Sequence, residues 1–216
     1  YITVLNGDGQ VLRELSILGA LEGSEFCPAI RLQWGRELLH TNAIVWLDGT
    51  HTGISPAYRR GNVLLSIRAL GALAVVDMDT GLVVWYQTGP WTGQHDPQLL
   101  SGDTILLFDN NRFGRHSRVL EWDPRERRVV GEYLGNPPET FFTEACGAAQ
   151  PLTNGNVLVT ESQDGRAFEV DQQGTIVWEW STPHRHPDDA GISAYLYEME
   201  RLDKASVERW LYGETG

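Results

Sequence analysis

The stretch DMDTGLVVW at residues 77–85 decides the fold, because it recurs along the chain. In each copy, a turn with an acidic or amide side chain leads into a strand rich in β-branched and aromatic residues. DPRERRVV at 123–130 and DQQGTIVW at 171–178 repeat the pattern at intervals of 46 and 48 residues, and NGDGQVL at 6–12 is a shorter copy. Self-similarity at a nearly fixed period indicates a repeat architecture.

Two further elements recur in front of each copy. One is a glycine turn that feeds an apolar strand, and the other is a strand that precedes this turn. Each unit therefore holds four short strands over about 45 residues, which is typical of one β-propeller blade. The glycine turns are GNVLL at 61–65, GDTILL at 102–107 and GNVLV at 155–159, and the strands before them are 40–47, 95–100 and 147–152.

The repeat predicts an all-β fold, a β-propeller of about four to six blades with four antiparallel strands each. Residues 40–88, 94–134 and 146–180 are predicted to form complete blades, residues 1–16 a partial blade and residues 192–202 a closing strand. We expect the 216 residues to be a single propeller domain or the C-terminal part of a larger ring. A partner chain, or the two ends themselves, would then cover the open blade edges.

Residues 16–39 do not follow the strand pattern. The segments 15–21 and 29–39 are predicted to form short helical turns within a long insertion. Insertions of this length are uncommon in compact domains and often carry function.

Composition excludes several functional classes. The net charge is −12, so a nucleic-acid-binding surface, which needs a basic face, is not expected. No apolar run approaches the roughly 18 residues of a membrane span, so no transmembrane segment is expected. Cys27 and Cys146 are the only cysteines, and we expect two buried free thiols. We expect neither a cofactor nor a metal ion.

Two of the six histidines, His40 and His95, begin the innermost strands of two adjacent predicted blades and so face one channel mouth. Asn42 shares a strand face with His40, Arg68 ends the next strand, and Asp96 follows His95. An arginine fork beside two imidazoles suits an anion such as sulfate, phosphate or carboxylate. The alternatives are an Arg–Asp pair that joins two blades, and histidines that serve only in packing or at the surface.

At these residues the chain resembles the bacterial arylsulfotransferases that use no nucleotide sulfate donor. The resemblance is carried by LHTNAI at 39–44, VLLSIR at 63–68, GPWTGQHDPQ at 89–98 and LLFDNN at 106–111, and it continues through 117–121, 150–162 and 165–170.

The resemblance implies a six-bladed propeller that moves a sulfuryl group from a phenolic sulfate ester to a phenol in two steps. His95 matches the histidine that takes the sulfuryl group. His40 and Asn42 match the H-x-N pair beside it, and Arg68 matches the arginine that holds the sulfate oxygens. A periplasmic or other extracytoplasmic location is also implied. The family's further channel histidine, which lies in an earlier blade, has no counterpart in this sequence.

Two other functions remain open on the sequence. A propeller can serve as a non-catalytic scaffold or as a subunit of a larger complex. The G-x-x-x-W pattern of Gly81–Trp85 and Gly174–Trp178 also occurs in quinone-cofactor dehydrogenases, which would need a calcium site and more blades. Intact His40, Asn42, Arg68 and His95 favour the sulfotransferase.

Overall fold

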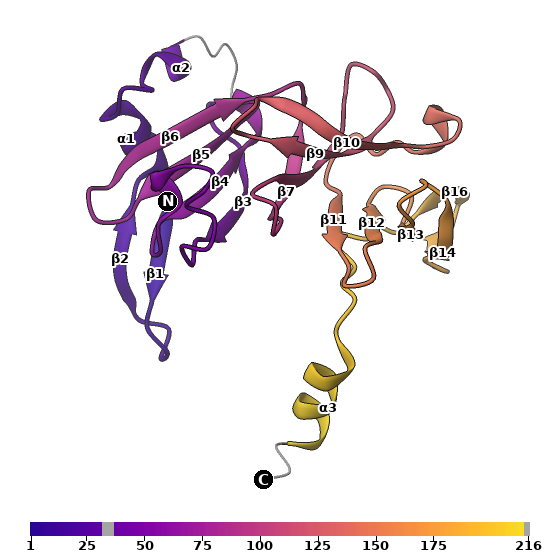
Figure 1. The fold of residues 1–216 in the computed structure, drawn as a ribbon. Helices are drawn as coiled ribbons and strands as arrows, with labels where there is room; N and C mark the ends of the chain where they lie inside the picture. Colours follow the sequence, from indigo (N-terminus) through magenta and orange to yellow (C-terminus); the bar gives the residue numbers. More distant parts are fainter. Residues whose placement is uncertain (32–36, 214–216) are drawn as a thin grey trace.

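The structure is a computed structural model that describes residues 1–31 and 37–213. Three four-stranded antiparallel sheets follow one another along the chain, each with its strands in chain order (Figure 1). We call them blades 1, 2 and 3. Their strands are β3 (Thr41–Trp46), β4 (Val63–Ile67), β5 (Ala72–Asp77) and β6 (Leu82–Thr88); β7 (Gln94–Leu99), β8 (Ile105–Asp109), β9 (Arg118–Asp123) and β10 (Arg128–Leu134); and β11 (Ala148–Pro151), β12 (Val157–Glu161), β13 (Arg166–Val170) and β14 (Ile176–Ser181).

These sheets confirm the predicted all-β propeller class. The recurring aspartates work as turn residues, because each carboxylate accepts backbone N–H groups of the loop between the third and fourth strands. Asp77 accepts from Asp79 and Thr80. Asp123 accepts from Arg125 and Glu126, and Asp171 accepts from Gln173 and Thr175.

The core lies between the blades rather than within them. Alternate residues of each strand point to opposite faces of its sheet. In blade 1, Leu64 and Val75 pack against blade 2, whereas Leu65 and Ala74 pack against the N-terminal elements. A third cluster, which includes Phe108 and Phe168, joins blades 2 and 3. Burial on both faces explains why β4 is buried along its whole length.

The N-terminal segment covers the free face of blade 1. Its hairpin consists of β1 (Ile2–Leu5) and β2 (Val11–Leu15). Ser16 caps α1 (Ile17–Glu22), where the sequence predicts a helical turn. Of the turn predicted at 29–39, α2 (Pro28–Arg31) forms the start, and residues 32–36 lie outside the described residues. Short 3₁₀ helices η1 (Pro56–Tyr58), η2 (Arg68–Leu70) and η3 (Pro138–Thr140) lie in the loops.

The closing strand predicted at 192–202 is wrong. A hairpin of β15 (Arg185–His186) and β16 (Asp189–Ser193) ends at Ser193, and the chain then crosses blade 3 without a ladder. Its amides instead make single bonds, such as Leu196 N–H to the Ser162 carbonyl and Met199 N–H to Thr160 Oγ1. Without a partner strand, alternating side chains do not make a sheet.

The C-terminal helix α3 (Lys204–Tyr212), capped by Asp203, extends away from the sheets (Figure 1). Among the described residues, no helix is long and apolar enough to cross a membrane. Cys27 and Cys146 are free, as predicted, but both are only partly buried.

Candidate active site

His40 and Arg68 lie side by side at one edge of blade 1. His40 directly precedes β3, and Arg68 opens η2 directly after β4. Because β3 and β4 are antiparallel, the beginning of one lies beside the end of the other, and Thr41 pairs with Ile67. The Arg68 N–H donates to the His40 carbonyl at 3.1 Å. The two residues therefore share one mouth of the blade.

Asn42 connects this edge to blade 2. Its Nδ2 donates to the carbonyl of Gln94 at 2.7 Å, and Ser66 Oγ reaches the same carbonyl at 3.4 Å. Gln94 directly precedes His95, and in return its Nε2 donates to the Ala72 carbonyl at 3.1 Å. Asn42 thus fixes the backbone from which the His95 side chain emerges.

His95 is a half-buried imidazole whose protonation is set by its neighbours. Its Nδ1 lies 2.8 Å from the Gly93 carbonyl, so Nδ1 carries the hydrogen and Nε2 keeps its lone pair. Burial lowers the pKa of His95 to about 4, and the charges of Arg68 and His40 act in the same direction. At neutral pH His95 is therefore an uncharged base with a bare Nε2.

His40 is more exposed than His95, with 36% of its side chain open to solvent. Its Nδ1 lies 2.5 Å from Glu37 Oε2, so the carboxylate holds the ring and directs Nε2 elsewhere. Sequence reasoning missed Glu37, since one carboxylate three residues before a strand is an ordinary surface feature.

The innermost strands begin with a strained backbone. His40 has φ +46° and Asp96 has φ +47°, a region that residues other than glycine seldom adopt. Gly147 lies just before β11 at φ +111°, and a Cβ there would meet the Phe108 ring at 2.4 Å. Glycine is therefore required in blade 3 at the place where the first two blades carry histidine. Such strain gathers at functional sites.

Asp96 does not pair with Arg68. Its carboxylate accepts the Ala149 N–H at 3.0 Å and Gln98 Nε2 at 2.6 Å, and so ties blade 2 to blade 3. Burial raises the pKa of Asp96. The alternative interpretation of an Arg–Asp link between blades therefore does not hold for this neighbouring aspartate.

Polar atoms without partners gather around His95. Among the described residues, seven buried side-chain nitrogen or oxygen atoms make no hydrogen bond, and five of them belong to the residues around His95. Buried polar atoms normally find partners, so such a cluster marks a place suited to a polar ligand. The five atoms are Asn42 Oδ1, Arg68 Nε, Thr92 Oγ1, Gln94 Oε1 and Asn110 Oδ1.

A cavity of about 680 Å³ lies along the free edge of β3. Its lining is mainly apolar, and Asn42 brings it into contact with the residues around His95. Volume and lining are in the range of small-molecule sites. The other lining residues are Tyr1, Ile2, Ser16, Ile17, Leu18, Leu39, Thr41, Ala43, Ile44 and Leu65.

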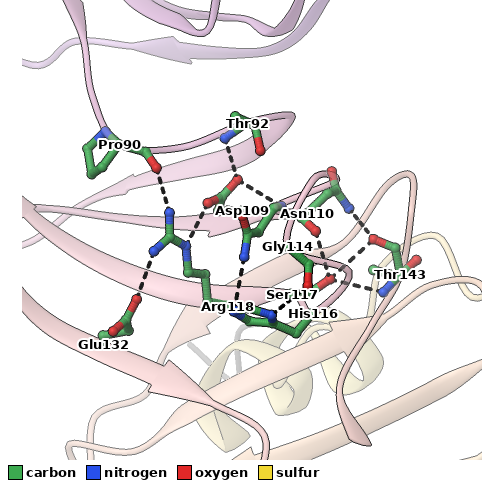
Figure 2. A network of polar contacts seen from close by, with 11 residues as sticks. Pro90, Thr92, Asp109, Asn110, Gly114, His116, Ser117, Arg118, Glu132 and Thr143 are labelled. Carbon is green, nitrogen blue, oxygen red and sulfur yellow. Dashed lines mark hydrogen bonds and ion pairs between the residues drawn. The ribbon is translucent and has the colours of Figure 1, made fainter. Parts of the chain in front are cut away.

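A buried polar network holds the end of β8 behind His95 (Figure 2). Asp109 is fully buried and accepts from Thr92 N–H at 2.8 Å and from Arg118 Nε at 2.8 Å. Arg118 also bonds Glu132 and the Pro90 carbonyl. Burial raises the pKa of Asp109, and Arg118 opposes this shift. The network fixes the loop that carries Asn110, a residue to which sequence reasoning gave no role.

Comparison with known proteins adds one family. A family model described as arylsulfotransferase (ASST) matches residues 31–183, a range that contains His40, Asn42, Arg68 and His95. No curated protein matches the chain.

Similar solved structures include the WD40 β-propeller domain of Doa1, with 10% identity, a TM-score of 0.46 and coverage of 66% of this chain and 41% of that one. Virginiamycin B lyase from Staphylococcus aureus has 12% identity and a TM-score of 0.45, over 83% of this chain and 47% of the lyase. A protein of unknown function from Bacteroides caccae has 12% identity and a TM-score of 0.40, over 83% and 68%. The chain thus spans less than half the length of the first two structures.

Proposed function

Because the chain belongs to the arylsulfotransferase family, we propose that it moves a sulfuryl group from a phenolic sulfate ester to a phenol through a sulfohistidine at His95. The observation that carries the proposal is the state of His95: uncharged, held at Nδ1 by the Gly93 carbonyl, and close to the positive charge of Arg68. A neutral imidazole with a fixed ring is a competent nucleophile.

In the first step, the Nε2 lone pair of His95 attacks the sulfur of the ester. The N–S bond forms as the S–O bond to the aromatic ring breaks, and the phenolate leaves with the electron pair. His40, in its protonated form, gives its Nε2 proton to the departing oxygen. Glu37 holds the other ring nitrogen of His40 during this transfer.

The second step runs the same path in reverse with a new phenol. His40 takes the phenol proton, the phenolate oxygen attacks sulfur, and the N–S bond breaks so that Nε2 of His95 regains its electron pair. The proton given in the first step is thus recovered in the second, and no cofactor enters the balance.

Arg68 supplies the anion contact in this proposal. Its buried Nε has no hydrogen-bond partner among the described residues, and its charge already acts on His95. A guanidinium fork fits two sulfuryl oxygens and stabilises the negative charge on them. Asn42 keeps β7 in place for the attack, as its bond to the Gln94 carbonyl indicates.

The aromatic part of the substrate is proposed to lie in the cavity beside β3. The cavity is next to Asn42, and Ile17, Leu39 and Leu65 give it apolar walls that suit an aryl ring. The proposed location, periplasmic or otherwise extracytoplasmic, follows from the family resemblance alone and is tested by cell fractionation.

Incubation of the protein with a chromogenic phenyl sulfate and a second phenol tests the function directly. We expect coloured phenol to be released and the second phenol to be sulfated, with kinetics in which each substrate reacts in its own half-reaction. Without acceptor, one equivalent should be released as the sulfohistidine accumulates. Binding of the phenyl sulfate with no release of phenol would instead favour the non-catalytic scaffold.

The first half-reaction should also persist in mild acid. With a pKa of about 4, His95 is still about 90% neutral at about pH 5, whereas an ordinary histidine would be only about 3% neutral. The release of phenol before turnover should therefore change less than about twofold between about pH 7 and pH 5 and fall as the pH drops through about 4. Stopped-flow measurement of this phase checks the sign. A tenfold loss by about pH 5.5 would contradict the structure.

A further inference from the structure

Asn110 lies on the same sheet face as His95. It directly follows β8, and Gln94 of β7 pairs with Asp109, so the next position along β8 lies across from Gly93. Residues two apart on a strand share a face, which puts Asn110 with Phe108 and His95 on the side toward blade 3. A Cβ on Gly93 would come within 3.4 Å of Asn110 Oδ1.

The orientation of the Asn110 amide is fixed. Nδ2 donates to two carbonyls of the chain that leads into blade 3, those of Thr143 and Cys146, both at 2.8 Å. Carbonyls accept only, so Nδ2 must face them and Oδ1 must face the other way. Asn110 is fully buried, and its Oδ1 makes no hydrogen bond among the described residues. This oxygen faces the imidazole of His95.

We propose that Asn110 is the positioning residue for His95: its Oδ1 and the Gly93 carbonyl form a pair of acceptors that hold the Nδ1–H side of the ring. The inference rests on the proposed sulfuryl transfer for its purpose. When Nε2 takes up the sulfuryl group, the ring gains positive charge and Nδ1–H becomes a stronger donor. Two neutral acceptors then stabilise that charge at the moment it forms.

The chemistry explains an amide at this place rather than a carboxylate. A carboxylate beside the ring would raise the pKa of His95 and protonate the nucleophile before it reacts. The charged or titratable groups that face His95 are Arg68 from η2 and His40 from the start of β3, and both favour the uncharged ring. Asn110 supports the charged product without opposing them.

Ser117 offers a matched control, because it anchors the same loop without facing His95. Its Oγ accepts from Thr143 N–H at 3.0 Å and lies 3.5 Å from the Asn110 carbonyl (Figure 2). Ser117→Ala therefore loosens the loop and leaves the Asn110 side chain in place.

The experiment measures the titration of the His95 imidazole by NMR in the resting protein, and sulfuryl transfer separately. In Asn110→Ala we expect the pKa of His95 to fall further, because an acceptor of Nδ1–H is lost, and kcat to drop about tenfold with little change in KM. Ser117→Ala should lower stability and leave both readouts at wild-type values. If Asn110→Ala fails to fold, Asn110→Asp should shift the pKa upward.

An unchanged His95 titration in Asn110→Ala, or in Asn110→Asp where that variant is used, overturns the proposal. An equal shift in Ser117→Ala also overturns it, since the loop and not the oxygen would then be responsible. The titration needs no substrate. Failure of the proposed function therefore shows as absent transfer with the shift intact, and failure of this inference shows as an absent shift.

Discussion

Replacement of His95 with asparagine is expected to abolish sulfuryl transfer, with a loss of about 10⁴-fold or more in kcat. An amide nitrogen has no available lone pair, so it neither attacks sulfur nor leaves from it. Asparagine keeps a polar side chain of similar reach, which preserves the start of β7 held by Asn42. The matched control is His184→Asn, at an exposed histidine near the end of blade 3, which should keep full activity.

Mass spectrometry separates the nucleophile from other roles. Wild-type protein treated with a phenyl sulfate in the absence of acceptor should gain one SO₃ group, retained on the peptide that contains His95 and lost on addition of a phenol. His95→Asn should gain none. A variant that still forms the adduct, or that turns over at the wild-type rate, would assign the nucleophile to another residue.

Much of the fold could be predicted from the sequence because the determinants are local and repeated. Aspartates such as Asp77 and Asp171 close their turns through their own side chains, and alternating apolar residues fix which faces are buried. The segment after Ser193 could not be predicted in this way. Its side chains alternate like those of a strand, but whether a strand forms depends on a partner edge far away in the sequence.

The site was predictable only where repeat positions align. His40 and His95 stand at equivalent places in two blades, and Asn42 and Arg68 follow from strand geometry. Asn110 and Glu37 gave no such signal. An asparagine after a strand is an ordinary turn residue, and its importance depends on the Thr143 and Cys146 carbonyls, which come from a different blade connection. Positioning residues act through three-dimensional contacts, and these leave no fixed spacing in the sequence.

Arg68→Lys is expected to lower kcat/KM by about 10²–10³-fold, although the charge is kept. The ammonium of lysine is a point charge and cannot present two parallel N–H groups to two sulfuryl oxygens. Arg59→Lys is the control, because Arg59 is a partly exposed arginine of the same blade that pairs with Asp77 and Asp79. It should leave the kinetics unchanged.

A third variant, Arg68→Gln, separates the two roles of the guanidinium. Its positive charge helps to lower the pKa of His95, so the neutral side chain should move the acid limb of the pH–rate profile to higher pH. Arg68→Lys should leave that limb in place and reduce only its height. If both variants lowered stability but kept the activity of the folded fraction, Arg68 would join blades rather than bind sulfate. The unpaired Nε argues for the anion, because an arginine that links blades would be expected to use that donor.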